Sequence, residues 1–97
     1  NINKRKLRCF KKHGVVCASC GIRGEFFALE IDPSNNNTHM LQLYAVKDRE
    51  HIQMTCDHIQ ARALGGATGR MSNLQTMCLP CNHKKSIIEQ QMYLMRK

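Results

Sequence analysis

Several short segments carry the apolar and polar pattern of β-strands. Residues 26–31 form a mostly apolar run, and residues 40–46 alternate roughly between apolar and polar side chains. Alternation of this kind predicts a strand with one buried face. Residues 47–50 are all charged and predict a turn, so 40–46 and 52–56 should pair as a β-hairpin. Residues 74–78 predict a further short strand or a turn.

The last part of the chain has the spacing of a helix. Pro80 suits a first helical turn, and we expect the helix to run over about residues 80–95. Its apolar positions form a stripe that predicts packing against the core rather than a partner surface. The stripe consists of Ile87, Ile88, Met92 and Met95. Elsewhere, the Asn-rich residues 32–37 and the Gly-rich residues 65–69 predict loops.

The net charge of the chain indicates which class of binding partner to expect. The 97 residues allow one small domain, with 15 Lys and Arg against 7 Asp and Glu and a net charge of +8. This excess favours phosphate-rich partners. Six of the basic residues lie within residues 1–13, where Leu7 and Phe10 are spaced for a short helix. That segment is either a solvated terminus or an arm that contacts phosphates.

Nothing in the sequence predicts contact with a membrane. No apolar run approaches the roughly 20 residues of a membrane span, and the N-terminus shows no signal peptide. We therefore expect a cytoplasmic protein. Its organisation is a basic N-terminal arm, residues 1–13, followed by one domain, residues 14–97.

A chain this small, without tryptophan, is expected to need a bound metal or disulfide bonds to stabilise its fold. Four of its six cysteines form two C-x-x-C pairs, Cys17 with Cys20 and Cys78 with Cys81. Two such pairs predict a tetrahedral zinc site of four thiolates. Two disulfides or a redox-active pair are the alternatives, and the lack of a secretion signal favours zinc. The remaining cysteines are expected to be small buried apolar residues. They are Cys9 and Cys56.

A longer pattern lies within residues 55–85. It contains Asp57 and His58 side by side, a Gly-rich loop, Asn73, and a C-x-x-C-N-x-x-K run over residues 78–85. Together these resemble the HNH family of nucleases, and most of all the stand-alone HNH endonucleases of bacteriophages and bacteria. The resemblance implies an α+β fold of the ββα-metal type, stapled by zinc, with a β-hairpin and a C-terminal helix. Residues 14–97 would then be the HNH nuclease domain, in the cytoplasm of a bacterium or a phage-infected host cell.

The residues of this pattern suit phosphodiester hydrolysis, which needs an activated water and a cation on the phosphate. Neutral His58 is a suitable general base near pH 7. Asp57 offers a carboxylate oxygen to Mg²⁺ or another divalent cation, and the resemblance makes Asn82 the second ligand. Asn73 can accept a hydrogen bond from the His58 ring and orient it. Zinc would hold the helix start, and with it Asn82, without taking part in the reaction.

Each of these residues also has a plain structural explanation. His58 could be a surface residue and Asp57 a turn residue. Asn73 could bond its own loop backbone, and Asn82 could cap the helix. Adjacent residues of a strand point to opposite faces. Asp57 and His58 can therefore meet at one phosphate only if the strand ends or distorts there.

Four basic residues near the pattern are candidate contacts for nucleic acid. Lys84 and Lys85 lie in the first helical turns, where the amide dipole and the ammonium groups both favour phosphate. Arg62 and Arg70 flank the Gly-rich loop and could hold the backbone on either side of the cut. A solvated surface charge is the alternative for each.

Three functions fit the sequence to different degrees. The first is a metal-dependent endonuclease that hydrolyses DNA, with double-stranded DNA as the expected substrate. The second is a non-catalytic, zinc-stabilised module that binds nucleic acid, and it leaves the set of Asp57, His58, Asn73 and Asn82 unexplained. The third is a thiol oxidoreductase, which gives His58 no role. Cutting both strands would call for a homodimer or a larger phage or bacterial assembly, since one site faces one strand.

Overall fold

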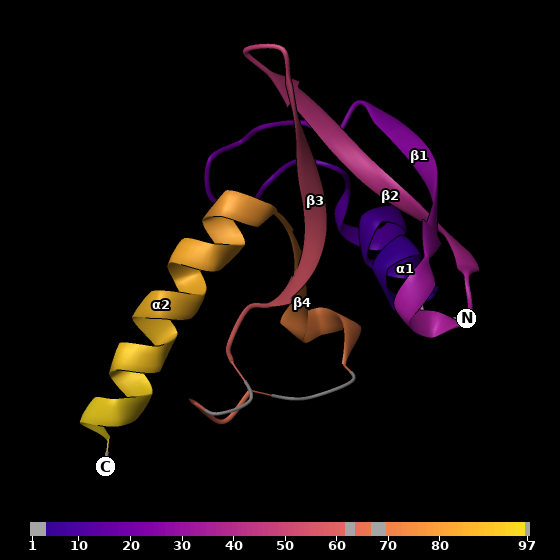
Figure 1. Cartoon of the computed structure of the whole chain (residues 1–97). Helices are drawn as coiled ribbons and strands as arrows, with labels where there is room; N and C mark the ends of the chain where they lie inside the picture. The colour runs from indigo at the N-terminus through magenta and orange to yellow at the C-terminus, as the bar shows by residue number, and fades with distance from the viewer. Residues whose placement is uncertain (1–3, 62–63, 67–69, 97) are drawn as a thin grey trace.

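Two helices and four antiparallel strands form an α+β fold in the computed structural model, which describes residues 4–61, 64–66 and 70–96 (Figure 1). The strands lie in the order β1-β2-β3-β4. Along the chain the elements are α1 (Lys4–His13), β1 (Phe26–Asp32), the 3₁₀ turn η1 (Pro33–Asn35), β2 (Thr38–Lys47), β3 (Glu50–His58), the 3₁₀ turn η3 (Met71–Asn73), β4 (Leu74–Cys78) and α2 (Leu79–Met95). The predicted strands, basic helix and C-terminal helix are confirmed, with longer bounds for several of them.

The predicted hairpin is formed by β2 and β3. Lys47 pairs with Glu50, and the two residues between them, Asp48 and Arg49, have φ angles of 51° and 67°. Positive φ at both central residues is typical of the two-residue turns that match the twist of antiparallel strands. The charged turn therefore has the geometry of a tight hairpin, although neither residue is glycine.

The strand β4 adds to the other edge of β3. The register runs from Met54 opposite Cys78 to His58 opposite Leu74. The helices cover opposite faces of this β3–β4 pair (Figure 1). Residues of β3 therefore face α2 or α1 alternately along the strand.

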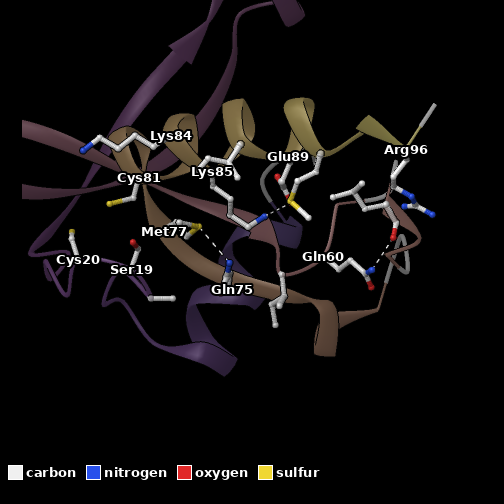
Figure 2. A pocket seen from close by; sticks show the side chains of 15 residues that line it. Ser19, Cys20, Gln60, Gln75, Met77, Cys81, Lys84, Lys85, Glu89 and Arg96 are labelled. Atoms are coloured by element: carbon white, nitrogen blue, oxygen red, sulfur yellow. Dashed lines mark hydrogen bonds and ion pairs between the residues drawn. The ribbon is translucent and has the colours of Figure 1, made fainter. Parts of the chain in front are cut away.

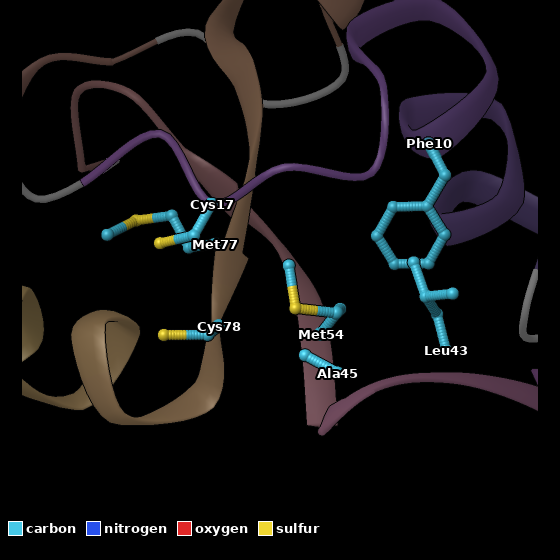
Figure 3. Close-up of a cluster of buried hydrophobic side chains, with 7 residues drawn as sticks. All are labelled: Phe10, Cys17, Leu43, Ala45, Met54, Met77 and Cys78. Carbon is cyan, nitrogen blue, oxygen red and sulfur yellow. The ribbon is translucent and has the colours of Figure 1, made fainter. Parts of the chain in front are cut away.

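The hydrophobic core joins α1 to the sheet. Phe10 is 5% exposed and packs with Leu43 and Ala45 of β2 and with Met54 of β3 (Figure 3). Of the two cysteines outside the pairs, Cys9 is fully buried as expected, whereas Cys56 is only half-buried. Residues 4–13 are thus a docked helix that completes the core. The boundary between an arm at 1–13 and a domain at 14–97 stays a prediction.

The apolar stripe of α2 does not pack in the core, so the prediction made from the sequence is wrong on this point. Its four residues are 46–85% exposed, with Met95 the most exposed. The reason is the length of the strands. β3 and β4 are covered by the first turns of α2, and the second half of the helix extends beyond them (Figure 1). None of the helices in the described ranges is long and apolar enough to span a membrane.

Candidate metal and nucleic-acid site

The first cysteine pair lies on a tight turn before β1. The backbone N–H of Cys17 donates to the carbonyl of Ile22 (2.8 Å), and that of Gly21 donates to the carbonyl of Cys17 (3.0 Å). Gly21 has φ +81°, a conformation that glycine adopts without strain. The turn is attached to β4 by the N–H of Ala18, which donates to Thr76 O (2.9 Å).

The second pair lies where β4 passes into α2. Cys78 is the last residue of β4 and Cys81 lies in the first turn of α2, after Pro80. All four sulfur atoms lie within 4.8 Å of one another, and those of Cys20 and Cys78 are 3.7 Å apart. Tetrahedral zinc with bonds of about 2.3 Å places its sulfur ligands about 3.8 Å apart. The residues therefore fit one zinc ion better than two separate pairs.

Charge in this cluster also favours a cation. Burial alone would raise the pKa of Cys17, but backbone amides that donate to its sulfur lower the pKa to about 6. Two of these amides belong to Ser19 and Cys20, at 3.4 and 3.5 Å. Burial raises the pKa of Cys78 to about 12. Four thiols this close can ionise together only when a bound metal offsets their charge.

Asp57 lies on the face of β3 that α2 covers. Its Oδ2 is 2.9 Å from Nζ of Lys85, which is 2.7 Å from Oε2 of Glu89 and donates to the carbonyl of His58 at 2.7 Å. Burial alone would lower the pKa of Lys85, but Glu89 and Asp57 together raise it above its ordinary value. The ammonium group of Lys85 is therefore enclosed by three oxygen atoms.

Asn82 faces the same side of β3 from the start of α2. Its Nδ2 donates to Oγ1 of Thr55 (2.9 Å), and this hydroxyl donates to the carbonyl of Met77 (2.8 Å). Residues 55 and 57 share a face of the strand. The N-cap of α2 is Cys78, so Asn82 does not cap the helix. Its Oδ1 has no hydrogen-bond partner among the described residues.

His58 is the last residue of β3, and the pairing does not distort there. Asp57 pairs with Gln75 and His58 with Leu74 in unbroken register. Alternation along this regular register directs the two side chains to opposite faces of β3. Nε2 of His58 is buried and has no hydrogen-bond partner in the described part of the chain.

Asn73 fixes the chain just beyond His58. Its Oδ1 accepts from the backbone N–H of Gln60 (3.0 Å), and its Nδ2 donates to the carbonyl of Gln60 (3.1 Å). Its own carbonyl accepts from the N–H of Ile59 (2.8 Å). These contacts hold the two residues after β3 in place.

The basic residues predicted to contact nucleic acid are placed differently from one another. Lys84 is exposed on α2, and Arg70 is exposed before η3. Lys85 has its charge engaged by two carboxylates. Arg62 lies outside the described residues.

A groove of about 950 Å³ runs along α2, from the cysteine cluster to Arg96 (Figure 2). Met77, Ile88 and Met92 are among its apolar lining residues, and Lys84 adds a positive charge. Glu89 also lines the groove and was not singled out from the sequence. Its spacing of four residues from Lys85 on a predicted helix was the available signal.

Comparison with known proteins gives one positive result. Residues 47–86 match the family described as HNH endonuclease. The matched range covers β3, β4 and the first turns of α2, so it includes every residue of the 55–85 pattern. Searches of curated proteins and of solved structures found no match.

Proposed function

Because residues 47–86 match the HNH endonuclease family, we propose that this protein is a metal-dependent endonuclease that hydrolyses phosphodiester bonds of double-stranded DNA. The observation that carries the proposal is the relation between β3 and the start of α2. The strand carries Asp57 and His58, and the helix that crosses it carries Asn82 directly after Cys81. A module that only binds nucleic acid does not need this set of residues.

Asp57 and Asn82 are the proposed ligands of the catalytic cation. Asn82 of α2 faces the side of β3 on which Asp57 lies, and Oδ1 of Asn82 has no partner among the described residues. A carboxylate and an amide oxygen are ligands that suit Mg²⁺, which keeps several waters besides them. When bound, the cation would polarise the phosphate oxygens and stabilise the leaving 3′ oxygen. Lys85 must first give up its contact with Asp57.

His58 is the proposed general base. A neutral imidazole accepts a proton from water near pH 7, and Nε2 of His58 has no competing partner in the described residues. Because the side chain leaves β3 on the face opposite Asp57, its use requires a change at the end of the strand. Asn73 holds the backbone at Gln60, two residues further on, and its proposed role is to position this segment.

Zinc is the proposed structural metal of the four cysteines. Cys78 is the N-cap of α2 and Cys81 directly precedes Asn82, so a bound zinc would fix the helix start against the turn at Cys17 and Cys20. Lys84, Lys85, Arg62 and Arg70 are the proposed contacts to DNA phosphates, with Lys85 becoming available when it leaves Asp57.

A non-catalytic nucleic-acid-binding module is the second candidate. The ion pair between Lys85 and Asp57, together with the opposite orientation of His58, favours it. In that case the pair would be a permanent structural contact and the protein would bind DNA without cutting it.

Plasmid cleavage separates the two candidates. Supercoiled plasmid is incubated with the protein in Mg²⁺, in buffer freed of divalent cations by dialysis, and in EDTA. Dialysis keeps zinc on the cysteines, so a loss of cutting there reports on the catalytic cation alone. We expect nicked or linear plasmid only with Mg²⁺. His58→Ala should abolish cutting, whereas His39→Ala, a change at an exposed histidine of β2, should not. Cutting by His58→Ala at the wild-type rate contradicts the assigned base, and binding without any cutting supports the second candidate.

A further inference from the structure

The exposed face of α1 carries an unusual concentration of positive charge. The helix has the sequence KRKLRCFKKH and contains no acidic residue. Its buried side is formed by Cys9 and Phe10. The exposed cations are Lys4, Arg5, Arg8, Lys11 and Lys12.

These cations are presented by a fixed helix. Phe10 belongs to the hydrophobic core, and Nε2 of His13 lies 2.9 Å from the carbonyl of Met71. The hydroxyl of Thr76 donates to the carbonyl of Gly14 directly after the helix (2.6 Å). Near the other end, Nζ of Lys6 donates to the side chain of Gln42 (2.8 Å). A partner therefore meets a preformed surface and does not have to order a loose terminus.

None of the exposed α1 cations forms an ion pair with another described residue. The two ion pairs within the described ranges both belong to Lys85. Lys4, Arg8 and Lys11 line a shallow groove of about 460 Å³ together with Leu7. At 1.5 Å per residue, Lys4 and Lys11 are separated by about 10 Å along the axis. This length corresponds to about three nucleotides of one strand of a duplex.

We infer that this face of α1, defined by Lys4, Arg8 and Lys11, is a docking surface for the phosphate backbone of duplex DNA. The identification of the partner as DNA rests on the proposed function. The surface is distinct from the Asp57 and Asn82 face, because α1 and α2 cover opposite sides of β3 and β4 (Figure 1). It lies on the side of the strand to which His58 points.

A membrane surface is a poorer partner for this helix. Interfacial helices insert an apolar face between lipid headgroups, and the apolar face of α1 is already used by the core through Cys9 and Phe10. A backbone contact needs only exposed cations, and it positions the duplex without reading its sequence.

The test is DNA binding measured by fluorescence anisotropy on a labelled duplex, over a range of NaCl concentrations and without divalent cations. The test variant is Lys4→Gln with Arg8→Gln and Lys11→Gln. The control removes the same charge from exposed residues elsewhere, by Arg23→Gln with Lys47→Gln and Arg49→Gln. Thermal unfolding of both variants verifies that they are folded.

We expect the α1 variant to bind about tenfold or more weakly at physiological salt. Its slope of log K against log [NaCl] should fall by about 0.9 for each lost phosphate contact, whereas the control should keep the wild-type slope. Equal losses of DNA affinity in the two variants, or no loss in the α1 variant, overturn the inference. Stronger binding of the wild-type protein to anionic vesicles than to the duplex overturns it as well. Because no divalent cation is added to the assay, cleavage does not affect the measurement. Plasmid cutting by the wild-type protein together with normal binding by the α1 variant leaves the proposed function intact and rejects this surface. Weakened binding by the α1 variant together with no cutting by the wild-type protein rejects only the proposed function.

Discussion

The ammonium group of Lys85 lies 2.9 Å from Oδ2 of Asp57 and is held further by Glu89 and by the carbonyl of His58. A side-chain cation thus occupies the carboxylate that is proposed to bind the catalytic metal. The two cations compete for one oxygen, so the strength of this ion pair should set how readily the metal binds.

Lys85→Met should therefore tighten metal binding. A partly exposed ion pair contributes about 0.2–1 kcal/mol, so the concentration of Mg²⁺ needed for half-maximal cutting should fall up to about fivefold. Calorimetric titration with Mn²⁺ measures the same effect without substrate. Lys84→Met, a change at the exposed neighbouring lysine, should leave metal binding unchanged. Weaker Mn²⁺ binding by Lys85→Met would show that the two cations do not compete.

Asn82 and Thr55 allow the ligand role to be separated from the structural one. Asn82→Ala removes both the hydrogen bond to Thr55 and the proposed metal ligand. Thr55→Val removes that hydrogen bond and the one from Thr55 to the carbonyl of Met77, but it keeps the proposed ligand. Each change should lower the free energy of unfolding by about 0.5–1.5 kcal/mol, measured by denaturant titration. Only Asn82→Ala should lose Mg²⁺-dependent cutting. Equal activities in the two variants would remove Asn82 from the metal site.

Loss of the cysteine cluster should unfold the protein. Structural zinc contributes on the order of 10 kcal/mol to the folding of small domains, and this core is small. Cys78→Ser should abolish zinc binding and the cooperative thermal transition seen by circular dichroism. Cys56→Ser is the matched control, because Cys56 lies outside the cluster. It should keep about one zinc per chain by elemental analysis. A folded, zinc-free Cys78→Ser would contradict the four-cysteine site.

The β2–β3 turn offers a stabilising change. Asp48 and Arg49 both adopt positive φ, which is disfavoured for residues with a Cβ. Replacing them by Asn and Gly, as Asp48→Asn with Arg49→Gly, supplies the preferred pair for such a turn. The free energy of unfolding should rise by about 1 kcal/mol. Arg49→Gln alone should leave it nearly unchanged, and a drop in the double variant would argue against the observed turn.

Local chemistry determined most elements of this protein. Alternating side chains predicted β2, the charged residues 47–50 its turn, and Pro80 the start of α2. The spacing of the two C-x-x-C pairs predicted the thiol cluster that the structure shows. These signals depend on neighbours in the chain, so they can be recognised without any knowledge of the fold.

The tertiary structure alone decided what each face of an element meets. The stripe of α2 has the spacing of a core-facing helix, but the strands are too short to cover Met92 and Met95. The pattern placed Asp57 beside His58, whereas an undistorted ladder sends them to opposite sides of β3. Lys85 meets Asp57 only because α2 crosses β3 at that point. Burial and pairing of this kind arise from contacts between distant segments, and the order of residues along the chain does not specify them.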